Sequence, residues 1–334
     1  SAASDVYKRQ GTHRLISDDV SMKNLGLVVI DEEQRFGVRH KEKFKERFKG
    51  IDVLTLSATP IPRTLAMTLY GDLDVSVIDE LPPGRQPIRT VHYTDAARLR
   101  LFGFMRQEIK KGRQIYVVYP LIKESETMDY KDLQDGYEAI SRDFPLPEYV
   151  TTICHGKMKP EDKEESMRQF KSGEANIMVA TSVIEVGVDV PNATVMVIES
   201  AERFGLSQLH QLRGRVGRGS QQSYCILMSG EKLSKEARLR LEAMCETNDG
   251  FRLAELDLKL RGAGDVNGTL QSGMAFDLKI ANPTLDSQIL TVTREAAAEV
   301  LTADPTLTQN GHEGLRELRK RYSGREEIDF SQIS

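Results

Sequence analysis

Three arginines lie close together between Gln208 and Gly219, where the sequence reads QLHQLRGRVGRG. Arg213, Arg215 and Arg218 are separated by glycines, which let the backbone turn tightly and leave room around the guanidinium groups. Converging guanidinium groups bind an anion through charge-assisted hydrogen bonds. The alternative is a low-complexity arginine-glycine tail, but here a helical pattern precedes the stretch and an apolar run follows it. The pattern favours a folded anion site of the kind that phosphoryl transfer needs.

The acidic residues Asp31, Glu32 and Glu33 follow the apolar run Leu27–Ile30, and the first two are candidates for chemistry. Buried parallel strands read as such runs, and open α/β sheets bind ligands at the carboxyl ends of their strands. Asp31 is therefore a candidate to hold Mg²⁺ through water, and Glu32 to orient an attacking water. A solvated strand end or a helix N-cap is the commoner origin of an isolated acidic pair.

A second apolar run, Val53–Leu56, leads to the hydroxyl residues Ser57 and Thr59. If this run is a neighbouring strand, the two hydroxyls are candidates to hydrogen-bond the acidic pair and to couple to the state of the nucleotide. The alternative is an ordinary turn before a helix that opens at Pro62.

A third cluster lies between Ala180 and Pro191. Thr181 and Ser182 supply hydroxyls for phosphate contact, and Asp189 supplies a carboxylate for a ribose hydroxyl or an arginine. A plain connection from a strand to a turn explains this stretch equally well.

The composition is that of a globular protein with two or three domains, because 39% of the 334 residues are hydrophobic. The formal net charge of −4 argues against wholesale coating by nucleic acid but allows a local basic groove. The three cysteines form no CxxC pair, so neither a disulfide framework nor a zinc site is indicated. No apolar run approaches the ~18 residues of a membrane span. We expect a cytoplasmic protein with no membrane partner.

Short apolar runs alternate with helical patterns, which predicts an α/β fold with parallel strands. The predicted strands are Gly26–Ile30, Val53–Leu56, Val75–Ile78, Ile115–Tyr119, Tyr149–Cys154, Ile177–Ala180, Thr194–Ile198 and Tyr224–Met228. The predicted helices are Pro160–Phe170, Ser234–Thr247, Gly250–Lys259 and Asp286–Leu301, with a glycine-rich loop over Leu260–Gly273 and a frayed tail at the end. The segment Glu80–Arg89 has the composition of an interdomain linker.

The phosphate-binding motif GxxxxGK[ST] is absent from the sequence. No loop of this chain therefore cradles the β and γ phosphates with a lysine, and half of a nucleotide site is missing.

The ordered clusters resemble those of a superfamily 2 helicase or translocase from its Walker B motif onward. Such motors resemble two RecA-like lobes with ATP in the cleft between them. Within the superfamily, four further stretches resemble the RecG family of bacterial branched-DNA translocases: Gly11–His13, Arg35–Val38, Ala58–Leu65 and Leu260–Gly273. The nearest relative of RecG is the transcription-repair coupling factor Mfd. The stretch Asp31–Gln34 resembles Mfd more, whereas Asp79–Arg85 and Gly268–Gly273 resemble RecG more.

The resemblance covers about residues 11–301 and implies a domain plan. Residues 1–10 are a junction foreign to the family, 11–88 the C-terminal part of the first RecA-like lobe, and 89–230 a complete second lobe. Residues 231–301 form a helical hairpin and translocation loop, and 302–334 a C-terminal tail. First-lobe residues and a wedge domain are expected upstream, and we expect the partial first lobe to expose apolar strand faces.

The resemblance also implies roles for the candidate residues. Glu32, Arg215 and Arg218 would be catalytic, and Asp31 would hold Mg²⁺. The other implied assignments are Gly187, Asp189 and Gln211 to ATP, Ser57 and Thr59 to coupling, and Thr181, Ser182, Arg261 and Gln271 to DNA.

The implied function is that of a fragment of an ATP-dependent DNA helicase, which couples ATP hydrolysis to remodelling of forks and Holliday junctions in recombination and repair. Without the phosphate-binding loop, the chain alone is expected to be inactive. Two alternatives stay open: an Mfd-like translocase, and a non-catalytic DNA-binding protein that has kept RecA-like lobes.

Overall fold

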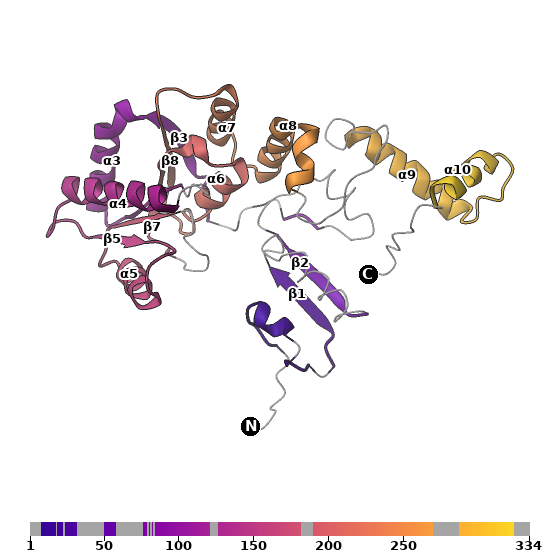
Figure 1. Cartoon of the computed structure of the whole chain (residues 1–334), viewed down its shortest axis with the longest axis horizontal. Helices are drawn as coiled ribbons and strands as arrows, with labels where there is room; N and C mark the ends of the chain where they lie inside the picture. Colours follow the sequence, from indigo (N-terminus) through magenta and orange to yellow (C-terminus); the bar gives the residue numbers. More distant parts are fainter. Residues whose placement is uncertain are drawn as a thin grey trace. The chain divides into compact units, whose positions relative to one another are not determined.

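The computed structural model describes most of the chain and divides it into two compact units (Figure 1). One unit comprises residues 1–76 and 261–334, and the other comprises residues 77–260. The described residues are 8–17, 19–22, 24–31, 50–57, 76–78, 80, 82, 84–120, 126–181, 190–269 and 287–323. No helix in these ranges combines the length and the hydropathy needed to cross a bilayer.

The second unit is built on a six-stranded parallel sheet with strand order β3-β8-β7-β4-β6-β5. Its strands are β3 (Arg89–Thr94), β4 (Gln114–Tyr119), β5 (Thr151–Cys154), β6 (Ile177–Thr181), β7 (Ala193–Ile198) and β8 (Tyr224–Ser229). Every residue of β6 and β7 is buried, which explains why these strands read as continuous apolar runs. The predicted α/β class with a parallel sheet is confirmed.

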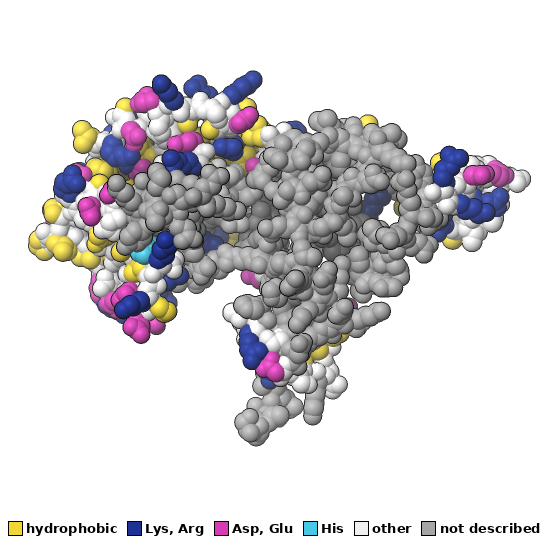
Figure 2. Space-filling view, viewed as in Figure 1, with side chains coloured by type: hydrophobic (Ala, Val, Ile, Leu, Met, Phe, Trp, Pro, Cys, Tyr) yellow, Lys and Arg dark blue, Asp and Glu magenta, His cyan; other side chains and the backbone are white. Residues whose placement is uncertain are grey.

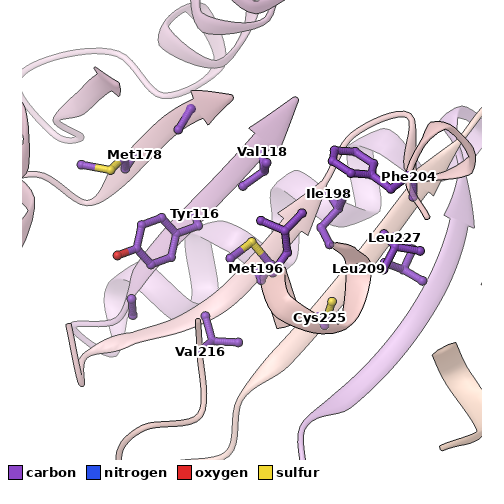
Figure 3. Packing of buried hydrophobic residues seen from close by; sticks show 14 of the residues in the cluster. Tyr116, Val118, Met178, Met196, Ile198, Phe204, Leu209, Val216, Cys225 and Leu227 are labelled. Atoms are coloured by element: carbon purple, nitrogen blue, oxygen red, sulfur yellow. The ribbon is translucent and has the colours of Figure 1, made fainter. Parts of the chain in front are cut away.

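Helices cover both faces of this sheet (Figure 1). On one face, α3 (Arg98–Lys110) and α4 (Glu126–Asp143) pack against a cluster that includes Ile115 and Val117. On the other face, α5 (Pro160–Ser172), α6 (Leu206–Arg213) and α7 (Lys235–Glu246) pack against a cluster that includes Tyr116 and Val118 (Figure 3). The alternation along β4 follows the two-residue period of a strand. Two 3₁₀ helices, η3 (Asp95–Ala97) and η4 (Ala201–Arg203), also belong to this unit.

The predicted strands do not include the edge strand β3, and the linker predicted over Glu80–Arg89 overlaps its first residue. Its sequence RTVHYT mixes polar and apolar residues, and a half-buried edge strand has no continuous apolar run. It is a strand because it pairs in parallel with β8, more than a hundred residues later in the chain. The strand predicted over Val75–Ile78 is wrong over residues 76–78, which have no regular structure, and Ile78 is 91% exposed.

The first unit contains a two-stranded parallel sheet of β1 (Leu27–Asp31) and β2 (Asp52–Leu56), preceded by the 3₁₀ helix η1 (His13–Ile16). Apolar side chains of both strands are exposed, among them Val29 at 53% and Val53 at 50%. Apolar strand faces are therefore exposed in the described part of this unit, as expected, whereas its assignment to a partial first lobe stays a prediction.

The C-terminal helices differ from the prediction. Helix α8 (Gly250–Thr269) covers most of the predicted loop, because Leu256 and Leu260 continue its apolar contacts and glycines weaken a helix without ending it. Helix α9 (Ser287–Ala303) confirms the prediction within two residues.

The tail predicted to be frayed instead contains α10 (Glu313–Ser323). Buried Asp304 accepts hydrogen bonds from the Gln309 N–H at 2.8 Å and from the His312 ring at 2.9 Å. These two contacts hold the pKa of Asp304 well below its usual range and fix the turn between α9 and α10.

Candidate functional site

Asp31 and Ser57 lie at the carboxyl edge of the β1–β2 sheet. Asp31 is the last residue of β1 and is paired in register with Leu56, and Ser57 follows β2 directly. Both residues are exposed. A carboxylate in this position has the chemistry of a magnesium ligand and the solvent access for binding through water. Glu32 and Thr59 lie outside the described residues.

The arginines lie on α6 and on the turn that follows it. We name residues 214–223, between α6 and β8, the arginine turn. The apolar face of α6 consists of Leu206, Leu209 and Leu212, which are buried in the core together with Val216 (Figure 3). Because these apolar side chains anchor the segment, Gln211, Arg215 and Arg218 are left half-buried at its surface.

Gly217 is the one position in the arginine turn where the backbone conformation requires a glycine. It has φ of 79°, a region that residues with a side chain rarely adopt, whereas Gly214 has the helical φ of −66°. We expected all three glycines to allow the tight turn, but by backbone dihedral only Gly217 is needed for it.

Arg213 does not converge with the other two arginines. Its side chain is only 2% exposed and donates to the carbonyl oxygens of Met244 at 2.9 Å and Thr247 at 2.8 Å. It also contacts Thr90 Oγ1 at 3.3 Å and His210 Nδ1 at 3.0 Å. Arg213 therefore ties the arginine turn to β3 and to the end of α7, and it is not available to an anion.

The sequence contained a sign of this role. Positions 206, 209 and 213 are spaced by three and four residues, so they share one face of a helix. Since that face is apolar, Arg213 belongs to the buried stripe, whereas Arg215 and Arg218 lie beyond the helix.

His210 is neutral in this setting. Burial, followed by the positive charge of Arg213, lowers the pKa of His210 to about 4. A neutral ring can accept a hydrogen bond through Nδ1 from the Arg213 guanidinium, so the two side chains are compatible only while the histidine is unprotonated.

Thr181 ends β6 and is buried, with an exposed fraction of 3%. Its Oγ1 has no hydrogen-bond partner in the part of the chain that the structure describes. Ser182, Gly187, Asp189 and Gln271 lie outside the described residues, and Arg261 lies on α8 with its backbone alone described.

A cavity of about 490 Å³ lies at the carboxyl edge of the central strands. Its lining includes Tyr119 from β4 and Glu199 directly after β7. Arg98 donates hydrogen bonds from Nη1 and Nη2 to the two oxygens of the Glu199 carboxylate. Asp95 and Asp135 make the lining acidic overall, which does not suit a phosphate. None of the predicted site residues that the structure describes lines this cavity.

Basic and acidic side chains are interspersed over the face of the second unit that Figure 2 displays. This agrees with the low net charge of −4.

Two protein families match the chain. The family described as "Helicase conserved C-terminal domain" matches residues 98–220, and the one described as "ATP-dependent DNA helicase RecG, domain 3, C-terminal" matches residues 247–334.

Curated proteins named ATP-dependent DNA helicase RecG are similar over nearly the whole chain. The protein of a Synechocystis strain is 50% identical over 93% of this chain and 37% of its own length. The proteins of Aquifex aeolicus and Bacillus subtilis are 46% and 47% identical over 98% and 91% of this chain, and over 41% and 44% of their own lengths. The chain thus spans less than half the length of these relatives.

Solved structures agree with this similarity. A structure of RecG bound to a three-way DNA junction matches 83% of this chain and 35% of that chain, with a TM-score of 0.62 and 45% identity. A variant of S. cerevisiae Dbp5 bound to RNA and ADP BeF3 matches 74% of this chain and 66% of that chain with a TM-score of 0.50 at 14% identity, which supports the fold alone.

Proposed function

The chain belongs to the RecG family of ATP-dependent DNA helicases, and on this premise we propose that it carries the second motor lobe and the translocation element of such an enzyme. The whole protein would couple ATP hydrolysis to remodelling of branched DNA, in keeping with the relative that was solved on a three-way junction.

The observation that carries the proposal is the construction of the arginine turn. Val216 and Arg213 are anchored in the core, so the backbone that bears Arg215 and Arg218 is fixed on a rigid lobe. Preorganised guanidinium groups stabilise the charge that develops on a transferring phosphoryl group. Arg215 and Arg218 would contact the γ-phosphate, with Gln211, Gly187 and Asp189 near the nucleotide.

In the first unit, Asp31 and Glu32 would supply the acidic side chains that a nucleotide site needs. Asp31 would hold Mg²⁺ through water, and the ion would neutralise charge on the β and γ phosphates. Glu32 would orient the attacking water, and Ser57 and Thr59 would couple this site to the rest of the lobe.

Arg213 provides a route from the nucleotide to DNA. Because it binds the carbonyl oxygens that end α7, a shift of the arginine turn would displace the start of α8, which carries Arg261. Arg261 and Gln271 would then act on duplex DNA, while Thr181 and Ser182 would bind backbone phosphates. Phosphate contacts read no base sequence and weaken with salt.

Unwinding of a three-way junction tests the function. We expect a protein with the upstream first-lobe sequence restored to unwind junctions of different base sequence equally well and more weakly as salt rises. DNA binding without any ATP turnover would instead favour the non-catalytic alternative. The chain alone lacks a phosphate-binding loop and is expected to release no phosphate above an Arg218→Ala control.

A further inference from the structure

The residues at the start of the second unit reverse direction and then lie along the arginine turn. The Arg85 N–H donates to the Pro82 carbonyl oxygen at 3.2 Å, and Gly84 has φ of 84°, so the chain turns back at this point. We name the residues that follow, Gln86–Arg89, the strap. Pro87 fixes one backbone dihedral of the strap and restricts the residue before it to extended conformations.

Three hydrogen bonds join residues 86, 87 and 89 of the strap to the arginine turn. They run from Gln86 Nε2 to the Ser220 carbonyl oxygen (3.2 Å), from Gln222 Nε2 to the Pro87 carbonyl oxygen (2.9 Å), and from the Arg89 N–H to the Ser223 carbonyl oxygen (3.0 Å). The strap is therefore held along its length and not at a single point.

The side chain of Ile88 fits against the bare backbone of Gly217. A Cβ atom built at Gly217 would lie 3.0 Å from Ile88 Cγ1, closer than side chains normally approach. Ile88 also packs at the margin of the core, and its carbonyl oxygen accepts from Asn248 Nδ2 at 3.2 Å. Ile88 thus contacts both the arginine turn and the junction between α7 and α8.

We propose that the strap is a positioning element for Arg215 and Arg218. The strap holds the backbone of the arginine turn, and in the sequence it lies between that turn and the first unit's residues 1–76. A displacement of the residues before Gln86 therefore moves the arginine turn as well. Pro87 limits the flexibility of the strap, and the three hydrogen bonds hold the strap to the turn. This inference rests on the proposed function of the two arginines.

The structural part of the proposal is tested by amide hydrogen exchange on the 334-residue chain. The double change Gln86→Ala and Gln222→Ala removes one exposed and one half-buried side chain and leaves the arginines unmutated. It also removes the bond from Gln222 Nε2 to the Ser223 carbonyl oxygen (3.0 Å) within the turn. We expect exchange at residues 214–223 to become about tenfold faster while the buried strands β6 and β7 keep their protection. The matched control is Gln134→Ala, which removes a half-buried glutamine bonded to Glu138 at 3.2 Å on α4. Unchanged exchange at 214–223 in the double variant overturns the proposal.

The functional part is tested with the upstream first-lobe sequence restored. We expect the double variant to lower kcat for ATP about tenfold with KM for ATP unchanged, because a misplaced arginine acts on the transition state. Faster exchange with an unchanged kcat overturns the positioning role. Absence of ATP turnover in the restored parent contradicts the proposed function. The exchange experiment then tests by itself whether the strap holds the arginine turn.

Discussion

The Arg213 guanidinium lies 2.8 Å from the carbonyl oxygen of Thr247, the residue that caps the end of α7. This contact joins α6, the helix that leads into the arginine turn, to the end of α7. A buried arginine that satisfies two backbone carbonyl oxygens is a mechanical link as well as a source of stability.

Replacing Arg213 by alanine is expected to destabilise the second unit by about 2–4 kcal/mol, because two carbonyl oxygens lose their donor and a cavity remains. Denaturant unfolding followed by circular dichroism measures this change. The exposed Arg142 on α4 gives a matched control, and Arg142→Ala is expected to shift the free energy of unfolding by less than about 0.5 kcal/mol. Equal effects of the two changes would contradict the structural role of Arg213.

His210 is expected to make the second unit less stable in mild acid. As the pH falls below 6.5, the histidine of the unfolded chain binds a proton, whereas the folded ring stays neutral until about pH 4. Stability contributed by the neutral ring is therefore complete above pH 6.5 and lost between pH 6.5 and 4, by at most about 3 kcal/mol.

Unfolding free energies of the parent and of His210→Asn across this pH range test the assignment. An asparagine oxygen can still accept from Arg213 but does not titrate, so the variant is expected to show a flatter pH dependence. Parallel curves for the two proteins would show that His210 does not titrate as described.

Two glycines of the arginine turn are expected to respond differently to alanine. Gly217→Ala forces a side chain into φ of 79° and against Ile88, so a loss of about 1–2 kcal/mol or more is expected. Gly214→Ala keeps a helical φ of −66° and is expected to stay within about 0.5 kcal/mol of the parent. Thermal unfolding of both variants gives the comparison, and a neutral Gly217→Ala would refute the backbone constraint.

A second pair of glycines separates helix propensity from packing. An alanine side chain at Gly136 on α4 would overlap the ring of Tyr119, whereas at Gly103 on α3 it would meet nothing within 4 Å. We expect Gly103→Ala to stabilise the protein by about 0.5–1 kcal/mol and Gly136→Ala to destabilise it by about 1–3 kcal/mol. The same sign of change in both variants would contradict this packing of Tyr119.

The central strands and their order along the chain were predictable because they are buried on both faces. Continuous apolar runs such as Ile177–Ala180 are typical of such strands, and Pro160 and Gly173 mark the two ends of α5. The edge strand β3 was not predictable in this way, since its structure depends on pairing with β8.

The candidate site was predictable in part. The position of Asp31 at a strand end and the arginine turn after α6 follow from local pattern, and both are present. The hydrogen-bond partners of Arg213 and the strap depend on contacts between distant segments, such as Arg213 with Thr247 and Gln86 with Ser220. Local spacing carries no information on which carbonyl oxygens a buried guanidinium will meet.

We propose that Arg215 and Arg218 act on the γ-phosphate of ATP. The most direct test measures DNA-stimulated phosphate release by the protein with its upstream first-lobe sequence restored, as parent and as Arg218→Ala. The account predicts a fall of about 10³-fold or more in the variant, with binding of a non-hydrolysable ATP analogue retained. Release by Arg218→Ala at the parental rate would contradict it.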